Sequence, residues 1–93
     1  MITDQQYRII KEVLSAFRPR LIGIFGSYAR NEQTKESDLD ILVNFGDTIS
    51  LLDIIGLEQE LSEKLGIKVD LLTERAVHPK IKKYIEEDLI ILE

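Results

Sequence analysis

The chain has 93 residues, which is enough for one domain over residues 1–93 with a single core and too few for a second, substrate-binding domain. A content of 44% hydrophobic and 31% charged residues is typical of a globular protein, and the lack of cysteine excludes a disulfide framework and a cysteine-based zinc site. The net charge of −5 argues against strong nucleic-acid binding, and no signal-peptide pattern or membrane-spanning apolar run occurs, so we expect a cytoplasmic protein.

The first half of the chain predicts one helix and two strands. Thr3 and Gln6 form a capping-box pattern, and the apolar residues behind them recur at helical spacing, which predicts a helix over 4–17. The run "LIGIF" at 21–25 is apolar throughout and predicts a buried strand. A polar, turn-rich segment follows, and "DLDILVNF" at 38–45 then alternates between apolar and polar residues, as a second strand does.

The second half continues with a helix, a strand and a helix. After a loop at 46–50, a helix is predicted over 51–65 with Gly66 at its end, then a strand over 67–73. Pro79 suits the first turn of a last helix over about 79–87, and "DLIILE" fits either its continuation or a short strand. The order α-β-β-α-β-α indicates an α+β (α/β) fold, a mixed sheet of three to four strands covered by helices.

Three acidic residues on the second and third predicted strands are candidates for a metal site. Asp38 and Asp40 lie two positions apart on one strand, so we expect both carboxylates on the same face. Asp70 is flanked by apolar residues, where a charged group is costly unless it is paired or metal-bound. Carboxylates this close repel one another unless a cation lies between them, and Mg²⁺ prefers such oxygen ligands. Three converging acids can hold two metal ions, or one metal ion beside a general base.

A Gly-Ser pair upstream of these acids is a candidate phosphate site. Gly26 and Ser27 follow the first buried strand and open a possible helical turn. Backbone N–H groups there can bind phosphate, glycine permits a close approach, and the serine hydroxyl adds a donor. Arg30, one turn further on, could reach the same anion. A phosphate site beside a metal site predicts phosphoryl or nucleotidyl transfer.

Each of these residues also has an ordinary structural explanation. Asp70 could face water on an edge strand and pair with Lys68, and Arg30 could be a surface residue. Tyr28 fits stacking on a base or packing in the core, and His78 before a proline is typical of a helix cap. The helix over 51–65 carries more apolar residues than one stripe requires, so a partner or a second copy would suit its surplus.

The Gly-Ser pair, ten intervening residues and then Asp-x-Asp resemble the signature of the DNA polymerase β-like nucleotidyltransferases. The stretches "GSYAR" and "SDLDILV" are most similar to the minimal nucleotidyltransferases (MNT), which consist of little more than the catalytic core. The resemblance implies that Gly26 and Ser27 bind nucleotide phosphates and that Asp38 and Asp40 ligate Mg²⁺.

The same resemblance implies roles for three further positions. Asp70 would be the third carboxylate, which assists the metal or deprotonates the acceptor hydroxyl, and Arg30 would have a phosphate-binding or structural role. Many members have glycine after this arginine, whereas Asn31 stands here. Asparagine tolerates positive φ better than most residues, so we expect the turn to survive.

The family also implies a biological setting. Many prokaryotic MNT proteins are antitoxins of a HEPN-domain toxin that resembles a ribonuclease, and related members move AMP from ATP onto a tyrosine of that partner. The resemblance therefore implies ATP as substrate, one or two Mg²⁺ ions and a HEPN partner, in a homo- or hetero-oligomer. Two alternatives stay open: an antitoxin that neutralises by binding alone, and the catalytic subunit of a small-molecule nucleotidyltransferase.

Overall fold

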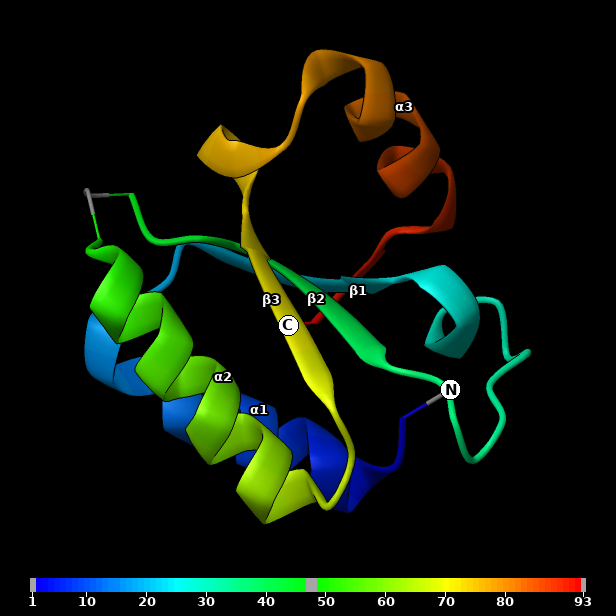
Figure 1. The fold of residues 1–93 in the computed structure, drawn as a ribbon, viewed down its shortest axis with the longest axis horizontal. Helices are drawn as coiled ribbons and strands as arrows, with labels where there is room; N and C mark the ends of the chain where they lie inside the picture. Colours follow the sequence, from blue (N-terminus) through cyan, green and yellow to red (C-terminus); the bar gives the residue numbers. More distant parts are fainter. Residues whose placement is uncertain (1, 47–48, 93) are drawn as a thin grey trace.

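The computed structural model describes residues 2–46 and 49–92 as a four-stranded mixed sheet with helices on both faces (Figure 1). Of the predicted loop at 46–50, residues 47–48 lie outside the described part. The helices and strands are, in chain order, α1 (Asp4–Leu14), β1 (Leu21–Phe25), β2 (Leu39–Asn44), α2 (Leu51–Leu65), β3 (Val69–Thr73), α3 (Pro79–Asp88) and β4 (Ile90–Ile91). Short 3₁₀ turns lie at Ser15–Phe17, Gly26–Tyr28 and Glu74–Ala76. The predicted α+β class and the order of the first six elements are confirmed.

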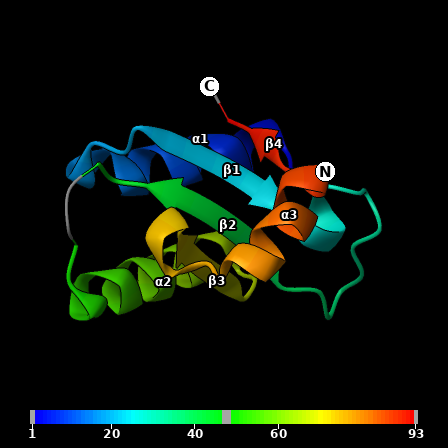
Figure 2. The same ribbon diagram turned by 90° about the horizontal axis from the view of Figure 1, so that it is seen from above.

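The sheet has the strand order β3-β2-β1-β4, which Figure 2 shows from above. β1 pairs antiparallel with β2 and with β4, whereas β2 and β3 are parallel and are connected through α2. The outer edge of β3 is covered by α2, because the Glu58 carboxylate and the Ser62 hydroxyl accept hydrogen bonds from Leu71 N–H (2.7 Å) and Val69 N–H (3.0 Å).

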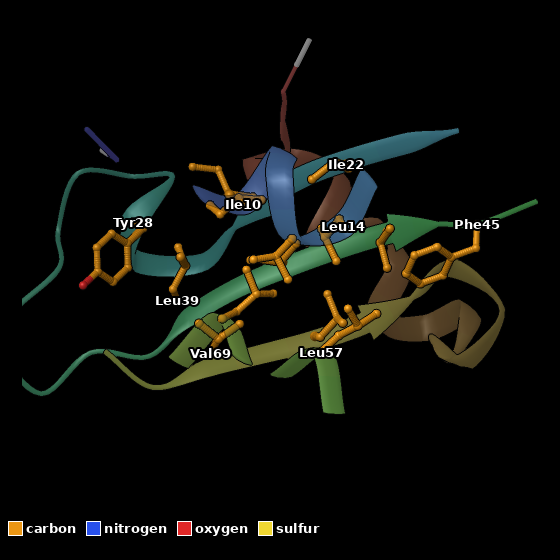
Figure 3. Close-up of a cluster of buried hydrophobic side chains, with 14 residues drawn as sticks. Ile10, Leu14, Ile22, Tyr28, Leu39, Phe45, Leu57 and Val69 are labelled. Atoms are coloured by element: carbon orange, nitrogen blue, oxygen red, sulfur yellow. The ribbon is translucent and has the colours of Figure 1, made fainter. Parts of the chain in front are cut away.

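The main core lies between α1, α2 and one face of the sheet. Figure 3 shows it extending from Tyr28 beside the start of β2 to Phe45 beyond its end. The alternation predicted for the second strand is confirmed, since Leu39, Ile41 and Val43 are fully buried on this face. A second apolar layer lies on the other face, where Leu42 lines a small hollow together with α3.

The local signals at the helix ends are confirmed. The Thr3–Gln6 capping box is formed, Ser50 caps α2, and Gly66 ends α2 with a φ of +70°. His78 caps α3 by accepting a hydrogen bond from Lys80 N–H at 3.1 Å, so its role in the described structure is that of a cap.

The boundaries and the tail differ from the sequence predictions in three places. The first helix is α-helical only to Leu14, because a 3₁₀ turn and a left-handed Arg18 before Pro19 close it. The second strand begins at Leu39, since its first ladder partner is Val69, which leaves Asp38 just outside. The tail forms the short strand β4, and Gly23 makes room for it: a Cβ there would lie 2.6 Å from a methyl carbon of Leu89.

Candidate active site

Two of the three predicted acids are direct neighbours across two strands. Asp40 on β2 and Asp70 on β3 are register partners in the parallel ladder, and neighbouring strands lie ~4.8 Å apart. Register partners point to the same face of a sheet, and here it is the face opposite the fully buried Leu39 and Ile41. The alternation of side chains along β2 therefore places core residues on the α1–α2 face and Asp40 on the opposite face.

The electrostatics of Asp40 show how crowded this pair is. Its pKa is raised from 3.8 to about 6, first by burial and then by the negative charges of Asp70 and Asp38. A hydrogen bond with the Asp70 side chain acts in the same direction, whereas the positive charge of Arg30 lowers the pKa. The site thus holds acidic groups whose repulsion a bound cation would relieve.

Asp38 takes a different position from the other two acids. Its carboxylate forms an ion pair with Lys68 at 3.5 Å, so the lysine that was considered as a partner for Asp70 contacts Asp38. Asp38 still acts on Asp40 through its charge. Among residues 2–46 and 49–92, no group of three Asp, Glu, His or Cys side chains is arranged to hold a metal ion. The structure therefore brings Asp40 and Asp70 together and leaves Asp38 at the margin.

The Gly-Ser bend lies directly against the acidic pair. Gly26 has a φ of +74°, and a Cβ at this position would overlap the Asp40 carboxylate, so glycine is required both for the backbone conformation and for the space. Gly26–Tyr28 form a 3₁₀ turn, and the N–H groups that begin such a turn have no partner within it. The bend thus places the backbone donors at its start beside the Asp40 carboxylate.

Two further residues of the motif fix this loop. Tyr28 is only 7% exposed and packs into the core beside Leu39 (Figure 3), so the alternative in which it stacks on a base is wrong for this structure. Asn31 has a φ of +59°, and its N–H bonds to the Tyr28 carbonyl at 3.3 Å. The expectation that asparagine supports the turn in place of glycine is confirmed.

Arg30 lies at the edge of the site in contact with two acids that the sequence analysis missed. Its guanidinium donates to Asp88 at 2.6 Å and to Glu32 at 3.2 Å, and these contacts raise its pKa. Asp88 is 58 positions away in the chain, so no local spacing could have connected the two residues. The only available signal was an acidic residue in the last turn of a helix, where negative charge is unfavourable.

The residues present can bind an anion and a hard cation side by side. Mg²⁺ is often held by one or two carboxylates together with substrate phosphates, which is the donor set that Asp40 and Asp70 offer beside Gly26. A hollow of about 270 Å³ at the far end of β2 and β3, next to Asn44 and Thr73, contains none of the predicted site residues. The predicted site residues thus lie away from this hollow, around the acidic pair.

Comparison with known proteins identifies the family. The nucleotidyltransferase domain family matches residues 7–92. A Methanocaldococcus jannaschii protein with the provisional name protein adenylyltransferase is 52% identical over 92 residues, 98% of this chain and 91% of that protein. Protein adenylyltransferase MntA of Thermococcus cleftensis is 41% identical over 80 residues, 86% of this chain and 81% of MntA.

A solved structure gives the same result in three dimensions. A crystal structure of a toxin–antitoxin with AMP-PNP aligns with a TM-score of 0.86 at 28% identity, covering 94% of this chain and 72% of that one. The resemblance stated from the Gly-Ser and Asp-x-Asp motifs is thus confirmed by sequence and by fold. This chain belongs to the nucleotidyltransferase domain family, and it is a minimal member.

Proposed function

We propose that this chain is an Mg²⁺-dependent protein adenylyltransferase that transfers AMP from ATP to a tyrosine of a HEPN-domain toxin, and that it acts as that toxin's antitoxin in the cytoplasm. The observation that carries the proposal is the register pairing of Asp40 with Asp70 beside the Gly26 bend. Two relatives carry the name protein adenylyltransferase, and a structure with the same fold is a toxin–antitoxin with AMP-PNP.

The proposed roles follow from the positions of the side chains. Gly26 and Ser27 hold the triphosphate through backbone N–H groups and the serine hydroxyl, and Arg30 adds charge-assisted hydrogen bonds. Asp40 and Asp70 would hold Mg²⁺, and Asp38 would join them once its carboxylate leaves Lys68. The donor set suits this ion, and burial together with the charges of Asp70 and Asp38, which raise the pKa of Asp40, are the conditions that a bound cation would relieve. When bound, the ion supplies charge stabilisation at the phosphates.

The transfer itself requires a base and an aligned acceptor. As the bond between the tyrosine oxygen and the α-phosphorus forms, the bond to pyrophosphate breaks, and the hydroxyl proton passes to Asp70. In this proposal, the protein partner presents the tyrosine to the acidic pair. Exposed apolar side chains at the start of α2, Leu51 at 73% and Leu52 at 80%, leave surface available for a partner.

No helix within the described residues has the length and apolar character to span a membrane.

The experiment combines the chain, α-labelled ATP, MgCl₂ and the HEPN-domain product of the neighbouring gene. Wild type is compared with Asp40→Asn, which removes the charge at nearly constant volume, and with Glu63→Gln, which removes a charge at an exposed position near the other end of α2. Label on a partner tyrosine, kept in Glu63→Gln and lost in Asp40→Asn, supports the proposal. Mass spectrometry of the partner locates the modified tyrosine.

Two other outcomes would replace the proposal. If no variant transfers label and all neutralise the toxin equally, the chain is an antitoxin that acts by binding alone. If the label appears on a small molecule in the presence of a separate substrate-binding subunit, the chain is the catalytic subunit of a small-molecule nucleotidyltransferase.

A further inference from the structure

The Arg30 guanidinium is held from two sides by carboxylates. Its Nη1 donates to Asp88 at 2.6 Å and its Nε donates to Glu32 at 3.2 Å. Glu32 is a local neighbour, and its side chain is 66% exposed, so this pair adds little. Asp88 is less exposed, at 27%, and it joins the end of α3 to the loop that follows the Gly26 turn.

The location of Asp88 in α3 is unfavourable for the helix alone. A negative charge in the last turn faces the negative end of the helix dipole, and α3 has no basic residue in its last turn to compensate. Glu86 and Glu87 add two more acids at the same end. The stabilising partner of Asp88 is therefore Arg30, from a distant part of the chain.

Arg30 keeps hydrogen-bonding capacity after these two contacts. A guanidinium has five N–H donors, and the two contacts use one on Nε and one on Nη1, which leaves one on Nη1 and both on Nη2. The Arg30 side chain is 45% exposed, and its positive charge lowers the pKa of Asp40. Within residues 2–46 and 49–92, three guanidinium donors thus remain after these contacts, on a group whose charge acts on Asp40.

We propose that Asp88 is a positioning residue for the nucleotide: it fixes the Arg30 guanidinium so that its remaining N–H groups meet the triphosphate beside Asp40. The inference rests on the proposed function, because it assumes that a nucleoside triphosphate occupies this face. Fixing a long arginine side chain before the ligand arrives lowers the entropy cost of binding. The residue contributed by α3 therefore acts through Arg30 and does not itself touch the substrate.

The test measures binding of AMP-PNP with MgCl₂ by calorimetry to the full chain, without a partner. Asp88→Asn removes the charge, Asp88→Glu keeps it, and Glu87→Gln removes an equal charge from the same helix end as a matched control. We expect Asp88→Asn to weaken binding about tenfold, Asp88→Glu to restore most of it, and Glu87→Gln to bind like wild type.

Two additional readouts separate positioning from a merely structural role. In an Arg30→Gln background, Asp88→Asn should cause no further loss of affinity, since the two residues act as one unit. The NMR signal of the Arg30 Nε–H should broaden or shift in Asp88→Asn but not in Glu87→Gln. In the transfer reaction, the KM for ATP should rise about tenfold while kcat stays within about twofold.

The inference is overturned if Asp88→Asn binds AMP-PNP as tightly as wild type, or if Glu87→Gln loses as much affinity. It is also overturned if the losses of Asp88→Asn persist without Arg30. Tight AMP-PNP binding with the expected losses, but no transfer to any partner, would leave the inference standing and remove the proposed function. Failure of the wild-type chain to bind AMP-PNP would overturn both.

Discussion

Replacing Asp40 by asparagine should make the metal-free protein more stable at neutral and alkaline pH. The pKa of Asp40 is raised from 3.8 to about 6 in the folded chain, by burial and by the charges of Asp70 and Asp38. The folded state thus binds the proton more tightly than the unfolded state does. Stability from this group is fully present below about pH 4 and is lost as the pH rises through about 6. This is opposite in sign to an ordinary paired aspartate.

The magnitude follows from the size of the shift. A change of about two pKa units corresponds to a ceiling of roughly 3 kcal/mol, at about 1.4 kcal/mol per unit. Because solvent reaches Asp40 and screens its interactions, about 1–2 kcal/mol is the realistic cost of ionising it. For a domain of this size, Asp40→Asn should then raise Tm by about 5–10 °C at pH 8.

The assay is urea unfolding followed by circular dichroism at pH 4.5 and pH 8, in EDTA. The free energy of unfolding of Asp40→Asn should exceed that of wild type by about 1–2 kcal/mol at pH 8. The difference should shrink at pH 4.5, where wild-type Asp40 is protonated. Asp53→Asn, an exposed change on α2, should show no such pH dependence. A difference that is absent at pH 8, or equal at both pH values, would refute the reasoning.

Three other changes test the same site. Mg²⁺ at millimolar concentration should raise the Tm of wild type at pH 8 by a few degrees and leave the Tm of Asp40→Asn unchanged in scanning calorimetry. An equal rise in both Tm values would contradict a site at this carboxylate. Gly26→Ala should lose about 1–3 kcal/mol of stability and most of the transferase activity, because its Cβ meets the Asp40 carboxylate at positive φ, whereas Gly56→Ala, with nothing within 4 Å of the added Cβ, should gain about 0.5–1 kcal/mol. Asn31→Gly should change stability by less than about 1 kcal/mol in urea unfolding, and Asn31→Val should cost more than about 1 kcal/mol because its φ is +59°; equal effects would show that the turn relaxes.

Much of this structure could be predicted because its strongest signals are local. The periodicity of 51–65, its serine cap and its closing glycine specify α2 without reference to any other segment. The pairing of Asp40 with Asp70 was also accessible, since two parallel strands joined through a helix bring equivalent positions together. The Gly26 bend was identified by its spacing from the same acids.

The remaining features depend on contacts between distant segments. The tail "DLIILE" suits a helix or a strand equally well, and the choice was made by Gly23, where the missing side chain leaves room for Leu89 and β4. The sequence placed the start of β2 one residue early, at Asp38 instead of Leu39, because alternation alone does not show where the pairing with β3 begins. The contact between Arg30 and Asp88 has no local signature at all.

The division of β2 between its two faces explains how so small a domain can hold a destabilising site. Leu39, Ile41 and Val43 are fully buried against α1 and α2, so folding is driven from one face of the strand. Asp40 projects from the other face, where α3 covers the sheet only in part. The free energy that the ionisation of Asp40 costs there is small enough for the core to offset. Two adjacent carboxylates are tolerated on this face, whereas on the fully buried α1–α2 face each ion would cost several kcal/mol in lost hydration. The acids are thus confined to the half-covered face, where α3 can add Asp88 to the site.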